Sequence, residues 1–201
     1  MAHYDVEQKP DEGYQSEARL EAALIAQLRT QGYEYVGVKD EAGLLRNLRR
    51  QLELLNDVLL SDSEWSRLLP QISNEQMTIQ DKTEMLQGKG YILEVLMDNG
   101  LKKNIKLIDK QNVYNNRLQV INQYTAEGAH KNRYDVTVLV NGLPMVHVEL
   151  KHRGVPIKEA FNQINRYLRD SFWAGRAMFD FVQIFVISNG TETKYYSNTT
   201  R

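Results

Sequence analysis

The sequence contains no cysteine among its 201 residues, which excludes disulfide bonds, thiolate zinc sites and a cysteine nucleophile. No apolar run approaches the roughly 20 residues that a membrane-spanning helix needs. The first residues are acidic and polar, unlike a secretory signal. We therefore expect a cytoplasmic protein that does not engage a membrane.

Several common motifs are also absent. The GKG at 88–90 lacks the leading glycine and the trailing hydroxyl of a phosphate-binding loop, so this chain is not expected to bind ATP. Neither G-x-S-x-G nor His-Glu-x-x-His occurs. The histidines are scattered, and His147 is expected to be a structural residue with its hydrogen bonds satisfied. The net charge is −1, although the chain from Lys151 onward has eight Lys and Arg against four Asp and Glu.

Hydrophobic periodicity predicts a mixed sheet with helices packed against it. Residues 1–15 are expected to form a flexible arm, and 16–201 one domain with a helical insertion at about 40–90. The predicted helices are 16–31, 40–60, 61–69 (ending before Pro70) and 155–172, whereas 73–90 is ambiguous. The predicted strands are 33–38, 91–97, 104–109, 117–125, a hairpin within 133–154, 181–190 and an edge strand near 194–198.

The hairpin sequence RYDVTVLVNGLPMVHVELKHRG (133–154) carries charge inside two strands that are otherwise apolar on alternate residues. Glu149 and Lys151 share one face of their strand. A three-residue loop would place Asp135 opposite Glu149, and a slip of one residue would separate them. Two carboxylates that meet repel each other unless one is protonated or a cation lies between them. The pattern therefore indicates either a charged solvent face or a site for Mg²⁺ or Mn²⁺.

Two helices offer further candidates. Glu21 falls inside the apolar stripe of helix 16–31, so it is either a third acid of the site or a helix-edge residue exposed to water. Glu17 lies in the first turn, where it would also favour the helix dipole. Gln163 and Tyr167 lie four residues apart beside the stripe Ile157–Phe161–Ile164–Leu168, and they either face the hairpin or form a surface pair.

The sequence resembles the N-terminal region of the R (restriction) subunit of type I restriction-modification enzymes from about Tyr14 to Thr200. The resemblance rests on SEARLEAALIAQLRTQGYEYV, the EW of SDSEWSRL, LQVINQY, the hairpin sequence, EAFNQINRY and QIFVISNGTETKYYSNTT. It implies a PD-(D/E)xK nuclease fold with a core of the order α-β-β-β-α-β. One departure is Tyr134, which stands where that motif has proline.

The resemblance also implies roles for the candidate residues. Asp135, Glu149 and the carbonyl of Leu150 would bind the metal, Lys151 would activate water, and Glu17 or Glu21 would supply the acid of the first helix. Gln163 and Tyr167 would match a Q-x-x-x-Y element that positions the site or the DNA, and Arg153 and Arg166 are expected to contact DNA.

The implied activity is endonucleolytic cleavage of double-stranded DNA without sequence specificity of its own. The resemblance further implies specificity (S) and methyltransferase (M) subunits as partners, and ATP-driven motor domains that this sequence lacks. We therefore expect it to be a piece of a longer protein. Two alternatives remain open: a degenerate nuclease fold that docks partner subunits, and a nuclease that acts alone.

Overall fold

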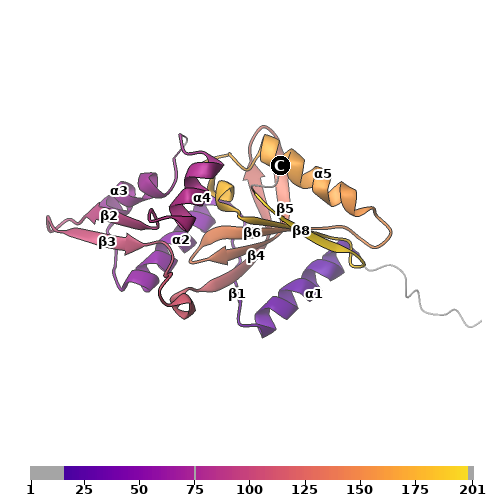
Figure 1. The fold of residues 1–201 in the computed structure, drawn as a ribbon, viewed down its shortest axis with the longest axis horizontal. Coiled ribbons are helices and arrows are strands. Elements are labelled where there is room, and N and C mark those ends of the chain that lie inside the picture. The colour runs from indigo at the N-terminus through magenta and orange to yellow at the C-terminus, as the bar shows by residue number, and fades with distance from the viewer. Residues whose placement is uncertain (1–15, 75, 199–201) are drawn as a thin grey trace, which may run out of the picture.

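The computed structural model describes residues 16–74 and 76–198, and the expected arm at 1–15 lies outside them. Its centre is a mixed six-stranded sheet in the order β1-β4-β5-β6-β7-β8 (Figure 1). The pairs β1–β4 and β6–β7 are parallel and the others antiparallel. The strands of this sheet are β1 (Glu34–Tyr35), β4 (Leu118–Glu127), β5 (Lys131–Val140), β6 (Leu143–Leu150), β7 (Ile184–Ser188) and β8 (Thr193–Ser197).

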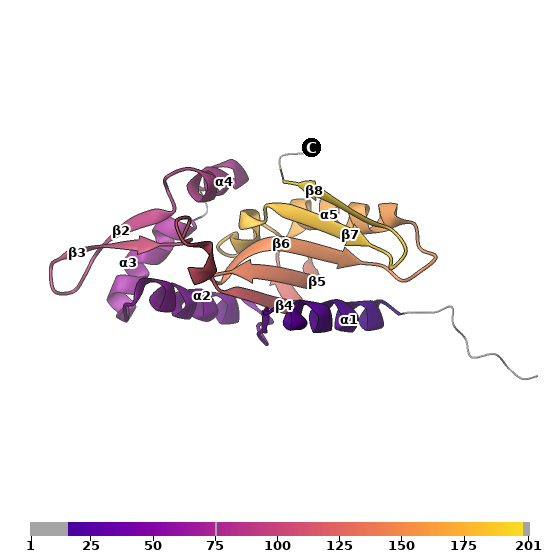
Figure 2. The same cartoon turned by 60° about the horizontal axis from the view of Figure 1, so that its bottom comes forward.

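Two helices cover the two faces of the sheet, α1 (Glu17–Thr30) and α5 (Ile157–Asp170) (Figure 2). Ser16 caps the N-terminus of α1. The apolar residues of this helix pack on Val120, Val136 and Val148 of the sheet. Helix α5 packs on the opposite face, together with the 3₁₀ turn η2 (Met178–Phe181). The predicted mixed sheet with helices against it is confirmed.

A second group of elements extends from one end of the sheet (Figures 1 and 2). It contains α2 (Glu41–Asn56), α3 (Asp62–Ile72), α4 (Ile79–Gln87) and the hairpin of β2 (Ile92–Leu96) and β3 (Lys102–Lys106). The Asp-Asn-Gly sequence at 98–100, a hairpin signal, joins β2 to β3. The apolar residues of this group bury each other and continue the core on the α5 side of the sheet. Its buried members include Leu44, Leu48, Leu52, Leu68, Ile72 and Ile105.

Two sequence predictions about this end of the chain need correction. Helix α3 continues through Pro70, which lies in its last turn and removes only one backbone hydrogen bond near the helix end. The strand expected at 33–38 is only two residues long. The described part of the ambiguous stretch at 73–90 is irregular apart from one helix, α4, whose start is fixed by a reciprocal capping box between Thr78 and Asp81.

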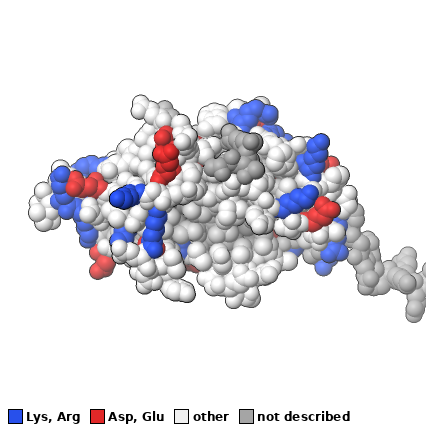
Figure 3. Space-filling view, viewed as in Figure 1, with Lys and Arg blue, Asp and Glu red and all other residues white. Residues whose placement is uncertain are grey.

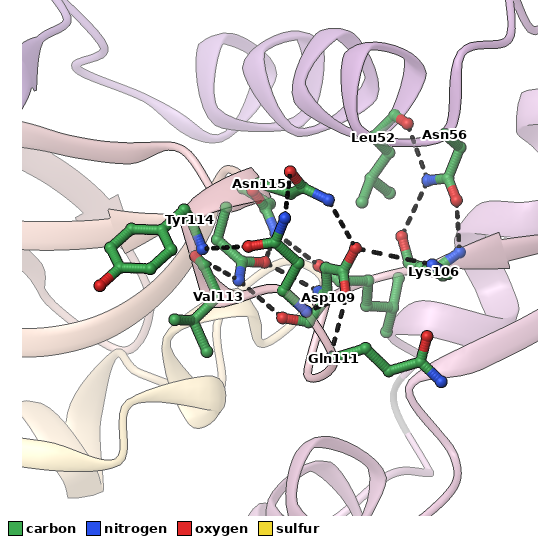
Figure 4. A network of polar contacts seen from close by, with 12 residues as sticks. Leu52, Asn56, Lys106, Asp109, Gln111, Val113, Tyr114 and Asn115 are labelled. Atoms are coloured by element: carbon green, nitrogen blue, oxygen red, sulfur yellow. Dashed lines mark hydrogen bonds and ion pairs between the residues drawn. The ribbon is translucent and has the colours of Figure 1, made fainter.

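The loop between β3 and β4 is held by a dense polar network around Asp109 (Figure 4). The Asp109 carboxylate accepts from the N–H groups of Gln111 and Asn112 and from the Asn115 amide. Asn112 in turn starts the short 3₁₀ turn η1 (Val113–Asn115). This network fixes the loop that leads directly into the long strand β4.

Within the described residues, no helix combines the length and apolar character needed to cross a membrane.

Candidate active site

A β-bulge in the β5–β6 hairpin sets the register that brings Asp135 to the position opposite Glu149. The turn itself contains only two residues, Asn141 and Gly142, both with positive φ. The register then shifts between Val138 and Leu139, so that Met145 is the extra residue on β6 and Val136 pairs with Val148. A two-residue turn without the bulge would place Asp135 opposite Val148. The three-residue loop is therefore replaced by a shorter turn plus a bulge, with the same net register.

The sheet is irregular at Asp135 itself. Pairing between β4 and β5 skips the position where Gln123 lies opposite Asp135, and Gln123 has a left-handed φ of 53°. Val136 packs under α1, whereas Tyr134 packs in the core on the α5 side. The alternation of faces thus changes phase at Asp135, a change that a regular period of two does not predict.

The two carboxylates approach each other where β5 and β6 separate. The Leu150 N–H donates to Asp135 Oδ2 over 2.9 Å, while the Leu150 backbone pairs with Ser188 on β7. Glu149 is fully buried, so the interpretation of this hairpin as a charged solvent face is wrong. Burial, and then the charge of Glu149, raise the pKa of Asp135 to about 7.

The Lys151 ammonium contacts two of the candidate metal-binding oxygens, those of Glu149 and of the Leu150 carbonyl. Its Nζ donates to Glu149 Oε1 and to the Leu150 carbonyl oxygen, each over 3.1 Å. A third oxygen, Glu17 Oε1, lies 3.9 Å from the same ammonium. The ammonium therefore neutralises part of the buried negative charge and touches the oxygens that a metal ion would use.

Glu21 faces the site from α1 with both of its oxygens occupied. Asn122 donates to Oε1 and Gln123 donates to Oε2. Successive residues of a regular strand point to opposite faces, so the left-handed backbone at Gln123 is what lets both amides reach one carboxylate. The Lys39 ammonium donates to Asn122 and completes this cluster. Asn122, Gln123 and Lys39 were not found from the sequence, because nothing in the strand pattern marks a change of phase.

The Gln163–Tyr167 pair lies beneath the hairpin. Gln163 donates to the Tyr167 hydroxyl, which donates to the Arg133 carbonyl oxygen over 2.9 Å. Burial, and then the charge of Glu149, raise the pKa of Tyr167. Tyr167 is only 1% exposed, so neither a surface pair nor direct contact of Tyr167 with DNA fits this conformation.

The buried face of α5 also differs from the predicted stripe. It is centred on Ala160, Ile164 and Tyr167, whereas Phe161 is partly exposed and packs on Tyr196. The cause is the aromatic core beneath the sheet, in which Tyr134 packs against Tyr167 with the ring centroids 4.8 Å apart.

His147 is buried, but it is not the satisfied histidine that the sequence suggested. Neither ring nitrogen has a hydrogen-bond partner, and Nε2 lies 3.5 Å from Glu149 Oε2. The sequence did indicate that His147 and Glu149 share one face of their strand. It did not reveal that both side chains are buried, and the contact between them depends on that burial.

Arg153 follows β6 in the chain and Arg166 lies within α5. Both are exposed, and the Arg166 guanidinium lies 5.5 Å from the centre of the Tyr167 ring. Figure 3 shows blue Lys and Arg side chains over α5 and at the β2–β3 end, with a largely uncharged area between them. Positive charge is thus local rather than spread evenly over this face.

The donor set fits a hard divalent cation in its chemistry. Two carboxylates and the carbonyl oxygen of Leu150 are the oxygen ligands that Mg²⁺ and Mn²⁺ prefer. Glu149 Oε2 is buried without a hydrogen bond, which is a costly state for a carboxylate oxygen. In the part of the chain that the structure describes, three or more His, Asp or Glu side chains do not gather around one point. A metal here would therefore have two side-chain ligands, one backbone ligand and water.

Comparison with known proteins gives one consistent family. A family model described as type I restriction enzyme R protein N terminus matches residues 14–201. The chain is 44% identical over 200 residues to the type I restriction enzyme EcoprrI endonuclease subunit of Escherichia coli, covering 98% of this chain and 64% of that protein. It is 40% identical over 190 residues to the SauMSSORF170P endonuclease subunit of Staphylococcus aureus, covering 92% of this chain and 20% of that protein. The chain thus spans less than two thirds of the first relative and a fifth of the second.

Proposed function

Since this chain belongs to the family of type I restriction enzyme R protein N termini, we propose that it is the DNA-cleaving domain of such a subunit. The proposed reaction is metal-dependent hydrolysis of DNA phosphodiester bonds on a PD-(D/E)xK fold. The observation that carries the proposal is the meeting of Asp135, Glu149 and Lys151 where β5 and β6 separate. The order α1, β4, β5, β6, α5, β7, with residues 34–106 set aside, supports the fold assignment.

Asp135, Glu149 and the Leu150 carbonyl would hold the Mg²⁺ or Mn²⁺ ion. When bound, such an ion stabilises negative charge on the phosphate and on the departing 3′ oxygen and makes its own water more acidic. The raised pKa of Asp135 supports this role, because two carboxylates buried side by side are electrostatically unfavourable until a cation joins them.

Lys151 would orient and activate the attacking water. In the structure its ammonium is held by Glu149 and by the Leu150 carbonyl. The same ammonium would donate a hydrogen bond to the attacking water beside the scissile phosphate, while a bound cation would supply positive charge at those two oxygens. Glu21 would support the site by holding Asn122 and Gln123 next to Asp135, and Glu17 by its proximity to Lys151.

Gln163 and Tyr167 would position the site rather than touch DNA. The Tyr167 hydroxyl ties α5 to the carbonyl of Arg133, two residues before Asp135. Exposed Arg153 and Arg166 would contact DNA phosphates. Phosphate contacts carry no sequence information, so cleavage by this domain would lack sequence specificity of its own.

In the complete enzyme, the cytoplasmic R subunit would act with specificity and methyltransferase subunits. The S subunit would choose the site, and ATP-driven translocation by motor domains outside this chain would precede cleavage. ATP would bind those domains and not this one. The names of the relatives support an endonuclease subunit.

The test is calorimetric titration of Mn²⁺ into this chain with a short DNA duplex. Wild type should bind metal, and Asp135→Ala and Glu149→Ala should each lose binding by at least about tenfold while keeping the wild-type circular dichroism spectrum. Glu127→Ala is a matched control, because it removes a carboxylate whose side chain is 80% exposed and which lies at the end of β4, paired with Lys131. If both site variants bind as wild type does, the two carboxylates are not metal ligands and the docking alternative replaces the nuclease.

A further inference from the structure

Unpaired buried polar atoms concentrate beside the proposed metal ligands. Among the described residues, six buried side-chain oxygen or nitrogen atoms lack a hydrogen-bond partner, and four of them belong to Thr137, His147 and Glu149. These three residues share one face of the β5–β6 hairpin, with Thr137 directly opposite His147. Each such atom costs free energy, so their gathering at one place requires an explanation.

The His147 ring lies in an aromatic enclosure. Tyr134, Tyr167, Phe172 and Phe185 surround it, with ring centroids between 5.5 and 6.5 Å away. The four rings offer a ring N–H only weak contacts with their π faces, and the hydroxyls of Tyr134 and Tyr167 are already hydrogen-bonded to other groups. Glu149 Oε2, 3.5 Å from Nε2, is therefore the strong acceptor nearest to this nitrogen among the described contacts.

We propose that His147 is a positioning residue for Glu149. Its Nε2–H would donate to Glu149 Oε2, which lies 3.5 Å away, while Oε1 keeps its contact with the Lys151 ammonium. His147 touches neither metal nor DNA and acts through the orientation of one carboxylate. The inference rests on the proposed function, because it assigns a partner to one of the proposed metal ligands.

The geometry explains why a histidine suits this place. Glu149 is fully buried, so water does not restrain its carboxylate, and a free carboxylate would rotate between several positions. A flat ring wedged among aromatic side chains holds its N–H in a fixed direction. Hydrogen bonds from residues outside the ligand set orient metal ligands, and their loss typically lowers metal affinity or activity 10–100-fold.

The test compares two variants of His147 in this chain. His147→Gln keeps a terminal amide N–H at about the reach of Nε2, whereas His147→Leu fills the space without a donor. With Mn²⁺ and a DNA duplex, we expect His147→Leu to bind metal about 10–100-fold more weakly than wild type and His147→Gln to recover most of the loss. Circular dichroism establishes that each variant is folded, and Asp135→Ala shows the loss of the site itself.

A measurement on the unsubstituted protein covers the case in which His147→Leu does not fold. The ¹⁵N chemical shifts of the His147 ring should place the proton on Nε2, and a proton only on Nδ1 would overturn the proposal. Equal metal affinity of His147→Leu and wild type would also overturn it, as would equal losses in the Leu and Gln variants. If wild type binds no metal while folded, the proposed function fails; if only the His147 comparison fails, the proposed function stands.

Discussion

Replacing Asp135 by asparagine should stabilise the metal-free protein, and the gain should grow with pH. The side chain has the same shape, and its carbonyl oxygen still accepts from the Leu150 N–H. What disappears is the cost of ionising a carboxylate that is buried next to Glu149.

The magnitude follows from the pKa of Asp135. The value rises from about 3.9 in an unfolded chain to about 7 in the folded protein. Below about pH 4 both states are protonated and the cost is absent. Between about pH 4 and 7 the unfolded chain releases its proton while the folded one retains it, so wild-type stability falls as pH rises. Above the folded pKa the cost is constant, at most about 4 kcal/mol.

The assay is urea unfolding followed by circular dichroism in the presence of a chelator. Asp135→Asn should exceed wild type by about 1–4 kcal/mol near pH 8.5, with equal denaturant slopes, and the two should converge near pH 4. Asp170→Asn is a control that should lower the free energy of unfolding instead of raising it, because a hydrogen bond from Arg169 lowers the pKa of Asp170. Adding Mn²⁺ should narrow the gap, since it stabilises only the chain that binds it. An equal stability of Asp135→Asn and wild type near pH 8.5, or a gain that is independent of pH, would refute the reasoning.

Three further predictions concern other parts of the molecule. Lys151→Met should bind Mn²⁺ more tightly than wild type, because the substitution frees Glu149 Oε1 and the Leu150 carbonyl oxygen. It should nevertheless abolish DNA cleavage in the complete enzyme. Weaker Mn²⁺ binding in calorimetry would show that the ammonium supports the ligands instead. Asp109→Asn should make the free energy of unfolding depend less on pH between about pH 4 and 2. Hydrogen bonds, first from the N–H of Asn112, lower the pKa of Asp109 to about 2. The stabilisation from the ionised Asp109 is therefore present above about pH 4 and is lost toward pH 2. Thermal melts across that range check this, and parallel profiles would contradict it. Tyr167→Phe should lose about 1 kcal/mol in urea unfolding, because its hydroxyl bonds two groups, and an unchanged midpoint would show that these bonds contribute nothing.

Patterns confined to one element were predictable from the sequence. Ser16 and Gly32 set the ends of α1, and the Asn-Gly pair at 141–142 marked the hairpin turn. Both signals are local, since capping and positive φ depend on one or two residues. The resemblance to the family was recognised from several such local stretches of sequence taken together.

Features that depend on packing between elements were not predictable in the same way. The face of α5 that is buried is decided by the aromatic core around Tyr134, not by the helix periodicity alone. The bulge at Met145 follows Pro144, and a proline within a strand is a recognisable sign of a bulge. The left-handed backbone at Gln123, by contrast, has no corresponding signal in the sequence of β4. Sequence alternation therefore identified the two acids, while their approach needed two irregularities that only the folded sheet displays.

These irregularities lie together, and that is an argument about function. The left-handed Gln123, the skipped pair at Asp135 and the unpaired atoms of His147 and Glu149 each cost free energy. Removing the charge of Asp135 is expected to stabilise the metal-free protein, since burial and the charge of Glu149 raise its pKa. Folding stability thus does not account for the arrangement, whereas local rules are commonly broken at functional sites. The metal site that we propose needs two converging carboxylates and would explain the arrangement, so the metal titration and the stability profile of Asp135→Asn both test that proposal.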